Sequence, residues 1–257
     1  MVELVSITLE SGIADVRLNR AEKLNALNQE MFEAIGAAVD RLTTLPVRCV
    51  VLSGTGRGFC AGVDLESLAS NPKLRDLQPR THGVANDFQY AAWGWRQLPI
   101  PVIAAVHGFA FGAGFQIMLG ADIRIAAPDT QLSMMETRWG LTPDVAGIAL
   151  LRGLVRDDVA RDIVYTARKF AGTEAAQLGL VTRVAADPLA EALALARQIA
   201  WQSPKAIRTS KRLLGLEGDA AALLMAESVE QEILLASLEH AETLAAAREK
   251  RAPVFED

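Results

Sequence analysis

The chain has 257 residues, about half of them apolar, and a formal net charge of −5. This length accommodates one large domain with a small extension, or two small domains, around a sizeable core. The mild negative charge without a basic cluster argues against a nucleic-acid partner, and no apolar run reaches the roughly 18 residues of a membrane span.

The first half of the sequence predicts alternating strands and helices. Residues 2–10 and 13–18 alternate between apolar and polar side chains around a Ser-Gly turn, which predicts a β-hairpin. Helical spacing follows over residues 28–42, with Asn28 as the expected N-cap. Further along the chain we expect buried strands at 47–52, 102–106 and 123–127, and a helix at 87–98 that stops before Pro99. This alternation is typical of an α/β domain.

Beyond about Asp157 the chain is mostly helical. Residues 189–201 are rich in Ala and Leu, and Ser203-Pro204 is typical of a helix start. Residues 219–251 have the pattern of one long helix with an apolar face. We expect these helices to pack on a neighbouring subunit or to cover their own domain.

Two glycine-rich loops follow buried strands. The first, SGTGRGFCAGVDL, contains Gly56-x-Gly58-x-x-Ala61, a loose match to a dinucleotide fingerprint in a loop longer than that fingerprint needs. The second is HGFAFGAGFQ, from His107 to Gln116. Two loops at strand ends can present two backbone N–H groups to one oxygen, so they predict an oxyanion hole. The alternative is that the glycines only permit tight turns.

Several segments occur in a characteristic order. They are VRLNRAEKLNALN (16–28), FCAGVDL (59–65), AVHGFAFGAGFQIMLGADIRIA (105–126), QLSMMETRWGLTPDVAG (131–147) and SPKAIRTSKRLL (203–214). Together they resemble the crotonase superfamily, also called the enoyl-CoA hydratase/isomerase family, over nearly the whole chain.

The resemblance implies an α/β fold with a crotonase-type ββα spiral core over residues 1–195. Residues 196–257 would then form a C-terminal helical region that builds a homotrimer or a dimer of trimers. The implied substrate is an acyl-CoA thioester, with no separate cofactor because coenzyme A is part of the substrate, and with no metal. Two cysteines outside any CxxC motif favour a cytoplasmic location.

The resemblance also implies an acyl-CoA site. By motif position, the backbone N–H groups of Val63 and Ala113 would hold an enolate oxygen, with Ala113 where the family more often has glycine. The substrate-binding positions carried over are Lys23, Ala26, Leu27, Ala61, Gly62, Asp64, Leu65 and Gly112. The alternative for Lys23 is a solvated surface lysine, and the alternative for Asp64 is a cap on the short helix that starts at Leu65.

Two positions decide which reaction is expected. Hydratases of this family use two glutamates, and these fall at Gln116 and Glu136. A glutamine can hydrogen-bond a water molecule but cannot act as a general acid or base near neutral pH. We therefore expect Glu136 to isomerise an enoyl- or dienoyl-CoA. The alternatives are 2-enoyl-CoA hydration, with Gln116 only orienting the water, and a non-catalytic acyl-CoA binding protein.

Asp144 lies eight residues after Glu136, in a context that resembles the dienoyl-CoA isomerases. That resemblance implies a second proton carrier. Asp144 fits equally well as the N-cap of a helix over residues 145–154, just after Pro143.

Overall fold

The computed structural model describes residues 3–255, and a six-stranded sheet forms the centre of its body. The strand order is β1 (Val5–Glu10), β2 (Ile13–Leu18), β3 (Cys49–Gly54), β4 (Val102–Val106), β6 (Ile123–Ala126) and β9 (Arg183–Val184). β1 and β2 are antiparallel and the other pairs are parallel, so the expected hairpin is confirmed. Val2, within the expected first strand, lies outside the described residues.

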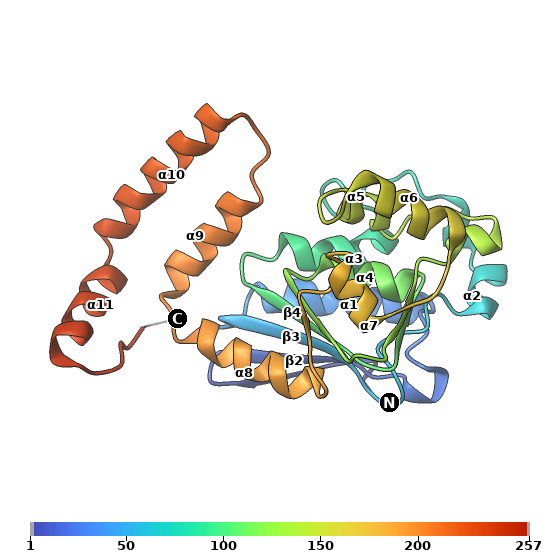
Figure 1. Cartoon of the computed structure of the whole chain (residues 1–257), viewed down its shortest axis with the longest axis horizontal. Helices are drawn as coiled ribbons and strands as arrows, with labels where there is room; N and C mark the ends of the chain where they lie inside the picture. Colours follow the sequence, from blue (N-terminus) through green and yellow to red (C-terminus); the bar gives the residue numbers. More distant parts are fainter. Residues whose placement is uncertain (1–2, 256–257) are drawn as a thin grey trace.

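Helices cover both faces of this sheet (Figure 1). Val50 and Leu52 of β3 belong to the cluster shared with α1 (Gln29–Leu42), α3 (Asp87–Gln97) and α4 (Ala113–Gly120). Cys49 and Val51 face the other way and pack with α8 (Pro188–Ala200). Because both faces of the strand are buried, β3 is a continuous apolar run rather than an alternating one.

Helix starts follow the capping residues. Asn28 is the N-cap of α1, where its side chain accepts a hydrogen bond from the Met31 N–H at 3.0 Å. Asn86 and Gln89 form a reciprocal capping box at the start of α3. Ser203 caps α9 (Pro204–Leu214), with Pro204 at the first helical position. Local chemistry therefore sets these boundaries.

A second, three-stranded sheet escaped the sequence analysis. It has the order β5 (Phe109–Phe111), β7 (Gln131–Ser133), β8 (Phe170–Ala171). α4 begins two residues after β5, and a 3₁₀ helix, η3 (Glu136–Trp139), begins three residues after β7. This small sheet therefore brings the start of α4 and Glu136 to one end of the body.

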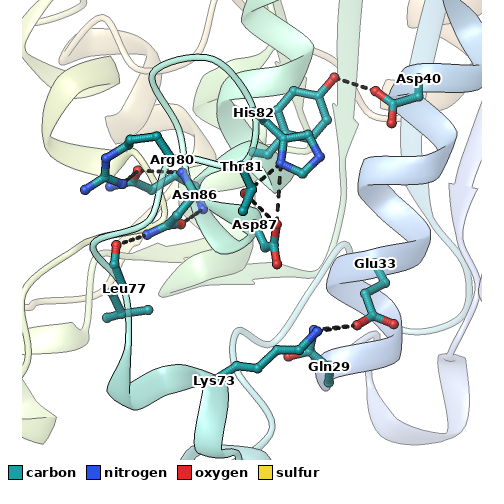
Figure 2. A network of polar contacts seen from close by, with 12 residues as sticks. Gln29, Glu33, Asp40, Lys73, Leu77, Arg80, Thr81, His82, Asn86 and Asp87 are labelled. Carbon is teal, nitrogen blue, oxygen red and sulfur yellow. Dashed lines mark hydrogen bonds and ion pairs between the residues drawn. The ribbon is translucent and has the colours of Figure 1, made fainter.

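The remaining elements surround that end. They are η1 (Ala21–Lys23), α2 (Leu65–Ser70), η2 (Pro72–Arg75), α5 (Gly147–Arg152), α6 (Asp157–Thr166) and α7 (Gly172–Gln177). Polar contacts fasten the η2 region and the start of α3 to the body (Figure 2). Lys73 reaches Glu33 of α1 at 2.9 Å, and the Asn86 side chain donates to the Leu77 carbonyl at 2.8 Å.

The C-terminal helices extend away from the body (Figure 1). The expected single helix over 219–251 is wrong: α10 (Ala220–Leu235) ends, and Ser237 caps a separate α11 (Leu238–Glu249). The apolar spacing continues across this break, which is why periodicity alone missed it. α10, described over its full length, contains no buried residue.

The expected boundary between residues 195 and 196 falls inside α8. Leu195 and Ala196 both belong to the cluster that packs against the sheet. The helices that leave the body therefore begin with α9, although the division itself stays a prediction. Within residues 3–255, none of the helices has the length and hydropathy needed to cross a bilayer.

A buried lysine ties α9 to the body. The Lys211 ammonium donates to Asp122 Oδ2 at 2.7 Å and to the carbonyl oxygens of Ile100 and Trp95 at 2.8 and 3.3 Å. Its side chain is 11% exposed, and burial lowers its pKa. Lys211 thus anchors α9 to the body.

Candidate active site

The two glycine-rich loops run side by side. The Cys60 N–H donates to the Phe109 carbonyl at 3.2 Å, and the Phe111 N–H donates to the Cys60 carbonyl at 3.0 Å. Gly62 has a φ of +95°, and a Cβ there would lie 2.8 Å from the Phe111 carbonyl oxygen. A side chain at Gly62 would therefore force the loops apart. These glycines bring the two strand ends together, which a simple tight turn would not require.

Asn25 organises the first loop, and the sequence analysis overlooked it. Its side chain is fully buried and donates to the carbonyls of Thr55, Gly58 and Phe59 at 2.9–3.1 Å. The backbone carbonyl of Asn25 accepts a hydrogen bond from the Cys60 thiol at 3.0 Å. An asparagine in a left-handed conformation, φ +55°, suits such a position, but nothing in the sequence near Asn25 indicates its partners, which lie 30–34 residues away.

A cavity of about 460 Å³ opens beside these loops. The residues around it that the sequence analysis selected are Lys23, Ala26, Ala61, Gly62, Val63, Asp64, Leu65, Gly112, Ala113 and Glu136. Leu27, Gln116 and Asp144 do not line it: Leu27 and Gln116 are fully buried, and Asp144 is half-buried. The fold therefore gathers most of the expected site around one cavity.

The start of α4 suits the expected oxyanion hole. Gly112 precedes Ala113 and takes the left-handed backbone, with φ +50°. Ala113 is the first residue of α4, and the first N–H groups of a helix have no partner within it. A Cβ built on Gly62 would lie 3.7 Å from the Ala113 nitrogen, so the Gly62-Val63 peptide is close to this helix end. The alanine creates no obstacle, because the strained torsion belongs to Gly112.

Glu136 begins η3 and is half-buried rather than a surface charge. Its Oε1 accepts a hydrogen bond from Gln116 Nε2 at 2.5 Å. Its Oε2 is buried and has no hydrogen-bond partner among the described residues. Burial raises the pKa of the Glu136 carboxyl, and the hydrogen bond from Gln116 opposes that rise. Such a carboxylate is a stronger base than one in water.

Gln116 lies beneath the cavity wall. Its Oε1 accepts from the backbone N–H groups of Val145 and Gly147 at 2.8 and 2.9 Å. A Cβ on Gly147 would lie only 2.5 Å from that oxygen, so the glycine makes the close approach possible. The amide thus connects α4, η3 and the residues before α5.

Asp144 does not cap a helix, so the capping alternative is wrong. α5 begins at Gly147, and its N-cap position is Ala146 with φ +62°. Burial raises the pKa of the Asp144 carboxyl, and the Asp144 charge contributes to raising the pKa of Glu136. The Asp144 charge therefore adds a small contribution to the larger effect of burial on Glu136.

Asp64 has a structural role at the cavity edge. It caps α2, accepting from the Glu66 N–H at 3.1 Å, and it pairs with Arg20 at 2.8 Å. The Arg20 guanidinium lowers the pKa of this carboxyl. Lys23 is exposed at the rim. Within residues 3–255, no group of three or more His, Cys, Asp or Glu side chains is placed to hold a metal ion.

The chain is similar to known proteins along most of its length. The family model described as enoyl-CoA hydratase/isomerase matches residues 8–257. The chain belongs to the enoyl-CoA hydratase/isomerase family. The human enoyl-CoA hydratase domain-containing protein 2, mitochondrial, is 33% identical over 258 residues, covering 96% of this chain and 86% of that protein. The mouse methylglutaconyl-CoA hydratase, mitochondrial, is 30% identical over 256 residues, covering 95% and 79%.

Solved structures of the family share the architecture. The crystal structure of an enoyl-CoA hydratase from Bacillus anthracis is 30% identical, has a TM-score of 0.89 and covers 98% of each chain. The crotonase-type α/β core with C-terminal helices is thereby confirmed for this family member.

Proposed function

We propose that this member of the enoyl-CoA hydratase/isomerase family moves the double bond of an enoyl-CoA thioester through a stabilised enolate. One observation carries the proposal. Glu136 lines the cavity, and its Oε2 has no hydrogen-bond partner among the described residues, whereas the other family position holds a neutral, fully buried glutamine. A single carboxylate can remove and return a proton, and Gln116 contributes no second acid or base.

The proposed reaction uses the two loop ends as donors. The thioester carbonyl oxygen accepts hydrogen bonds from the Val63 and Ala113 N–H groups. Glu136 takes a proton from C2 of a 3-enoyl-CoA, and the C–H electron pair moves into the conjugated system, placing negative charge on the carbonyl oxygen. The same proton returns to C4, which re-forms the thioester and leaves the double bond between C2 and C3. Loss of one oxyanion donor typically costs about 3–4 kcal/mol of transition-state stabilisation.

The substrate-binding positions carried over from the family are proposed to hold the CoA portion of the substrate. They are Lys23, Ala26, Leu27, Ala61, Gly62, Asp64, Leu65 and Gly112. The Leu27 side chain is buried, its N–H donates to the Gly62 carbonyl, and its carbonyl accepts from the Asp64 N–H. Leu27 therefore contributes by holding Gly62 and Asp64 in place.

Matched substrates in heavy water test this function. The protein is given 2-enoyl-, 3-enoyl- and 3,5-dienoyl-CoA of one chain length, and mass spectrometry locates deuterium and added water in the products. We expect double-bond migration without net addition of water, and a loss of about 10²–10⁴-fold in rate on Glu136→Gln. Glu30→Gln, on the exposed start of α1, is the control for the same substitution away from the cavity.

Hydration is the second candidate, because the curated relatives cited above carry the name hydratase. Fast formation of 3-hydroxyacyl-CoA from the 2-enoyl substrate would favour it over isomerisation. A non-catalytic role predicts a third result: acyl-CoA binds tightly, with no turnover by either the natural protein or Glu136→Gln.

A dienoyl-CoA substrate is the finer form of the proposal, and it assigns the second proton to Asp144, which is half-buried and follows Glu136 by eight residues. A 1,5-proton shift needs carboxyls near two separated carbons. If Asp144 carries the second proton, Asp144→Asn abolishes the 3,5-dienoyl reaction and spares the 3-enoyl reaction. Equal effects on both reactions would exclude that role. They would instead indicate an indirect effect from a residue that does not line the cavity.

We also propose that α9–α11 assemble the chain into a homotrimer or a dimer of trimers. The support is a set of exposed apolar side chains on α10 and α11: Leu224, Met225, Val229, Ile233, Leu235, Leu238 and Leu244. A monomeric protein seldom exposes apolar residues so densely. Light scattering after size exclusion measures the mass, and a monomer at micromolar concentration would contradict the proposal.

A further inference from the structure

The side-chain amide of Gln116 is fixed in one orientation. Its Oε1 accepts from two backbone donors, the N–H groups of Val145 and Gly147, at 2.8 and 2.9 Å. A flipped amide would place the NH₂ group against two N–H donors, which is repulsive. The NH₂ group must therefore point at Glu136, where it donates to Oε1 at 2.5 Å.

The two oxygens of the Glu136 carboxylate consequently differ. Oε1 is held by the Gln116 amide and lies against the second glycine-rich loop, because a Cβ on Gly112 would be only 3.1 Å from it. Oε2 is buried without a hydrogen-bond partner among residues 3–255. A hydrogen bond stabilises the charge on the oxygen that accepts it, so the amide fixes the carboxylate through Oε1 and favours its ionised form.

We propose that Gln116 is a positioning residue that fixes the Glu136 carboxylate by donating to Oε1, and so holds in place the base that accepts and returns the substrate proton. This inference rests on the proposed function in taking Glu136 as the base. In the forward step the C2–H bond breaks, an O–H bond forms on the Glu136 carboxylate, and the C–H electron pair enters the enolate. Return of the proton to C4 breaks that O–H bond and restores the carboxylate.

The geometry also explains why a glutamine suits this position. A carboxylate at residue 116 could still accept from the Val145 and Gly147 N–H groups. Its other oxygen would then face Glu136 Oε1 at the 2.5 Å now spanned by the amide. Two carboxyls so close share one proton and titrate as a coupled pair. With Gln116, Glu136 has no second carboxyl at hydrogen-bond distance on that side.

Three variants test the role of Gln116, each in a different way. Gln116→Leu removes both the acceptor and the donor, and Gln116→Glu keeps the acceptor but removes the donor. Gly147→Ala pushes the amide away while leaving Gln116 and Glu136 unchanged. Gln177→Leu, at the exposed end of α7, is the control for the glutamine-to-leucine change.

Two readouts are measured on the full-length protein. The first is the pH dependence of kcat and KM for whichever acyl-CoA reaction the natural protein catalyses. The second is a ¹³C NMR titration of the Glu136 carboxyl, assigned by its loss in Glu136→Gln, which requires no turnover.

We expect Gln116→Leu to lower kcat by about 10²-fold, the effect of a misplaced reacting group, with KM little changed. The Glu136 titration and the acid limb of the rate profile both move to higher pH, because the donor that stabilised the carboxylate is gone. Gln116→Glu gives two coupled titrations, and Gly147→Ala gives a smaller change in the same direction as Gln116→Leu.

The result that overturns the inference is a Glu136 titration and a kcat in Gln116→Leu equal to those of the natural protein. If Gln116→Leu does not fold, Gln116→Glu and Gly147→Ala decide by the same two readouts. If the natural protein hydrates 2-enoyl-CoA and does not isomerise, the proposed function fails, while the pH profile of hydration still tests Gln116. If it turns over none of the substrates, the NMR titration alone decides.

Discussion

The body and the C-terminal helices differ in how much of their apolar side chains is buried. In the body, strands such as β3 are buried on both faces, and Leu52 has no exposed surface. On α10, Leu224 is 61% exposed, and no residue of this helix is buried. Both regions are rich in Ala and Leu, so composition does not distinguish them. The difference shows that the body is stabilised by its own core, and it is the observation behind the proposal that the helical extension packs on other copies of the chain.

The largest expected effect comes from opening a cavity in the body. We expect Leu52→Ala to lower the free energy of unfolding by about 3–5 kcal/mol, from lost burial and the void that remains. Chemical denaturation monitored by circular dichroism measures it. Leu224→Ala is the matched control, because the same truncation at an exposed site changes the stability of the monomer by less than about 0.5 kcal/mol. Equal losses would break the comparison.

A smaller but still large effect is expected where the two regions meet. Lys211→Met leaves Asp122 without its ammonium partner. Breaking a buried pair typically costs about 3–5 kcal/mol, and this pair is partly exposed, with 11% of the Lys211 and 21% of the Asp122 side chain accessible. We expect the lower end, about 3 kcal/mol, because the Val102 N–H still donates to Asp122 at 2.8 Å. Thermal and denaturant unfolding measure the loss. The control is Lys205→Met on the same helix, where the lysine is exposed and the change should be small.

The third effect concerns assembly, where an exposed residue of α10 should matter and the core of the body should be unaffected. If α10 packs on other copies of the chain, a charge at Leu224 is costly only in the assembly. We expect Leu224→Lys to lower the mass seen by light scattering and to leave the unfolding of the body unchanged at low protein concentration. An unchanged mass would show that Leu224 lies outside the interface.

The smallest expected effect is a pH dependence within the body. Burial raises the pKa of Glu136, so its contribution to stability is fully present below pH 4.5 and is lost as the pH rises through the raised value. Glu136→Gln should therefore be more stable than the natural protein near neutral pH, and the gap should close in acid. Asp64→Asn is the opposite control. The pKa of Asp64 is lowered by Arg20, so its contribution is present above pH 3.8 and is lost as the pH falls. Denaturant unfolding at several pH values measures whether the stability of each variant, relative to the natural protein, rises or falls with pH.

Much of the fold follows from local signals in the sequence. Asn28, Ser203 and Pro204 mark helix starts where the structure has them. The apolar runs predict the central strands, and the ordered glycine-rich segments predict the loops that meet at the cavity. The strands of the small sheet, only two or three residues long, carry too few residues for a periodic pattern. The break before Ser237 escaped because apolar spacing continues through it.

By itself, the sequence determined the family, the central elements and the substitution of a glutamine for the first glutamate. Only the tertiary structure decided what that glutamine does. Gln116 contacts backbone groups 29 and 31 residues away and a carboxylate 20 residues away. Asn25 likewise binds carbonyls 30–34 residues along the chain. The sequence specifies which donors and acceptors each side chain carries. The partners that satisfy a buried side chain depend on which distant segments the packed core brings beside it.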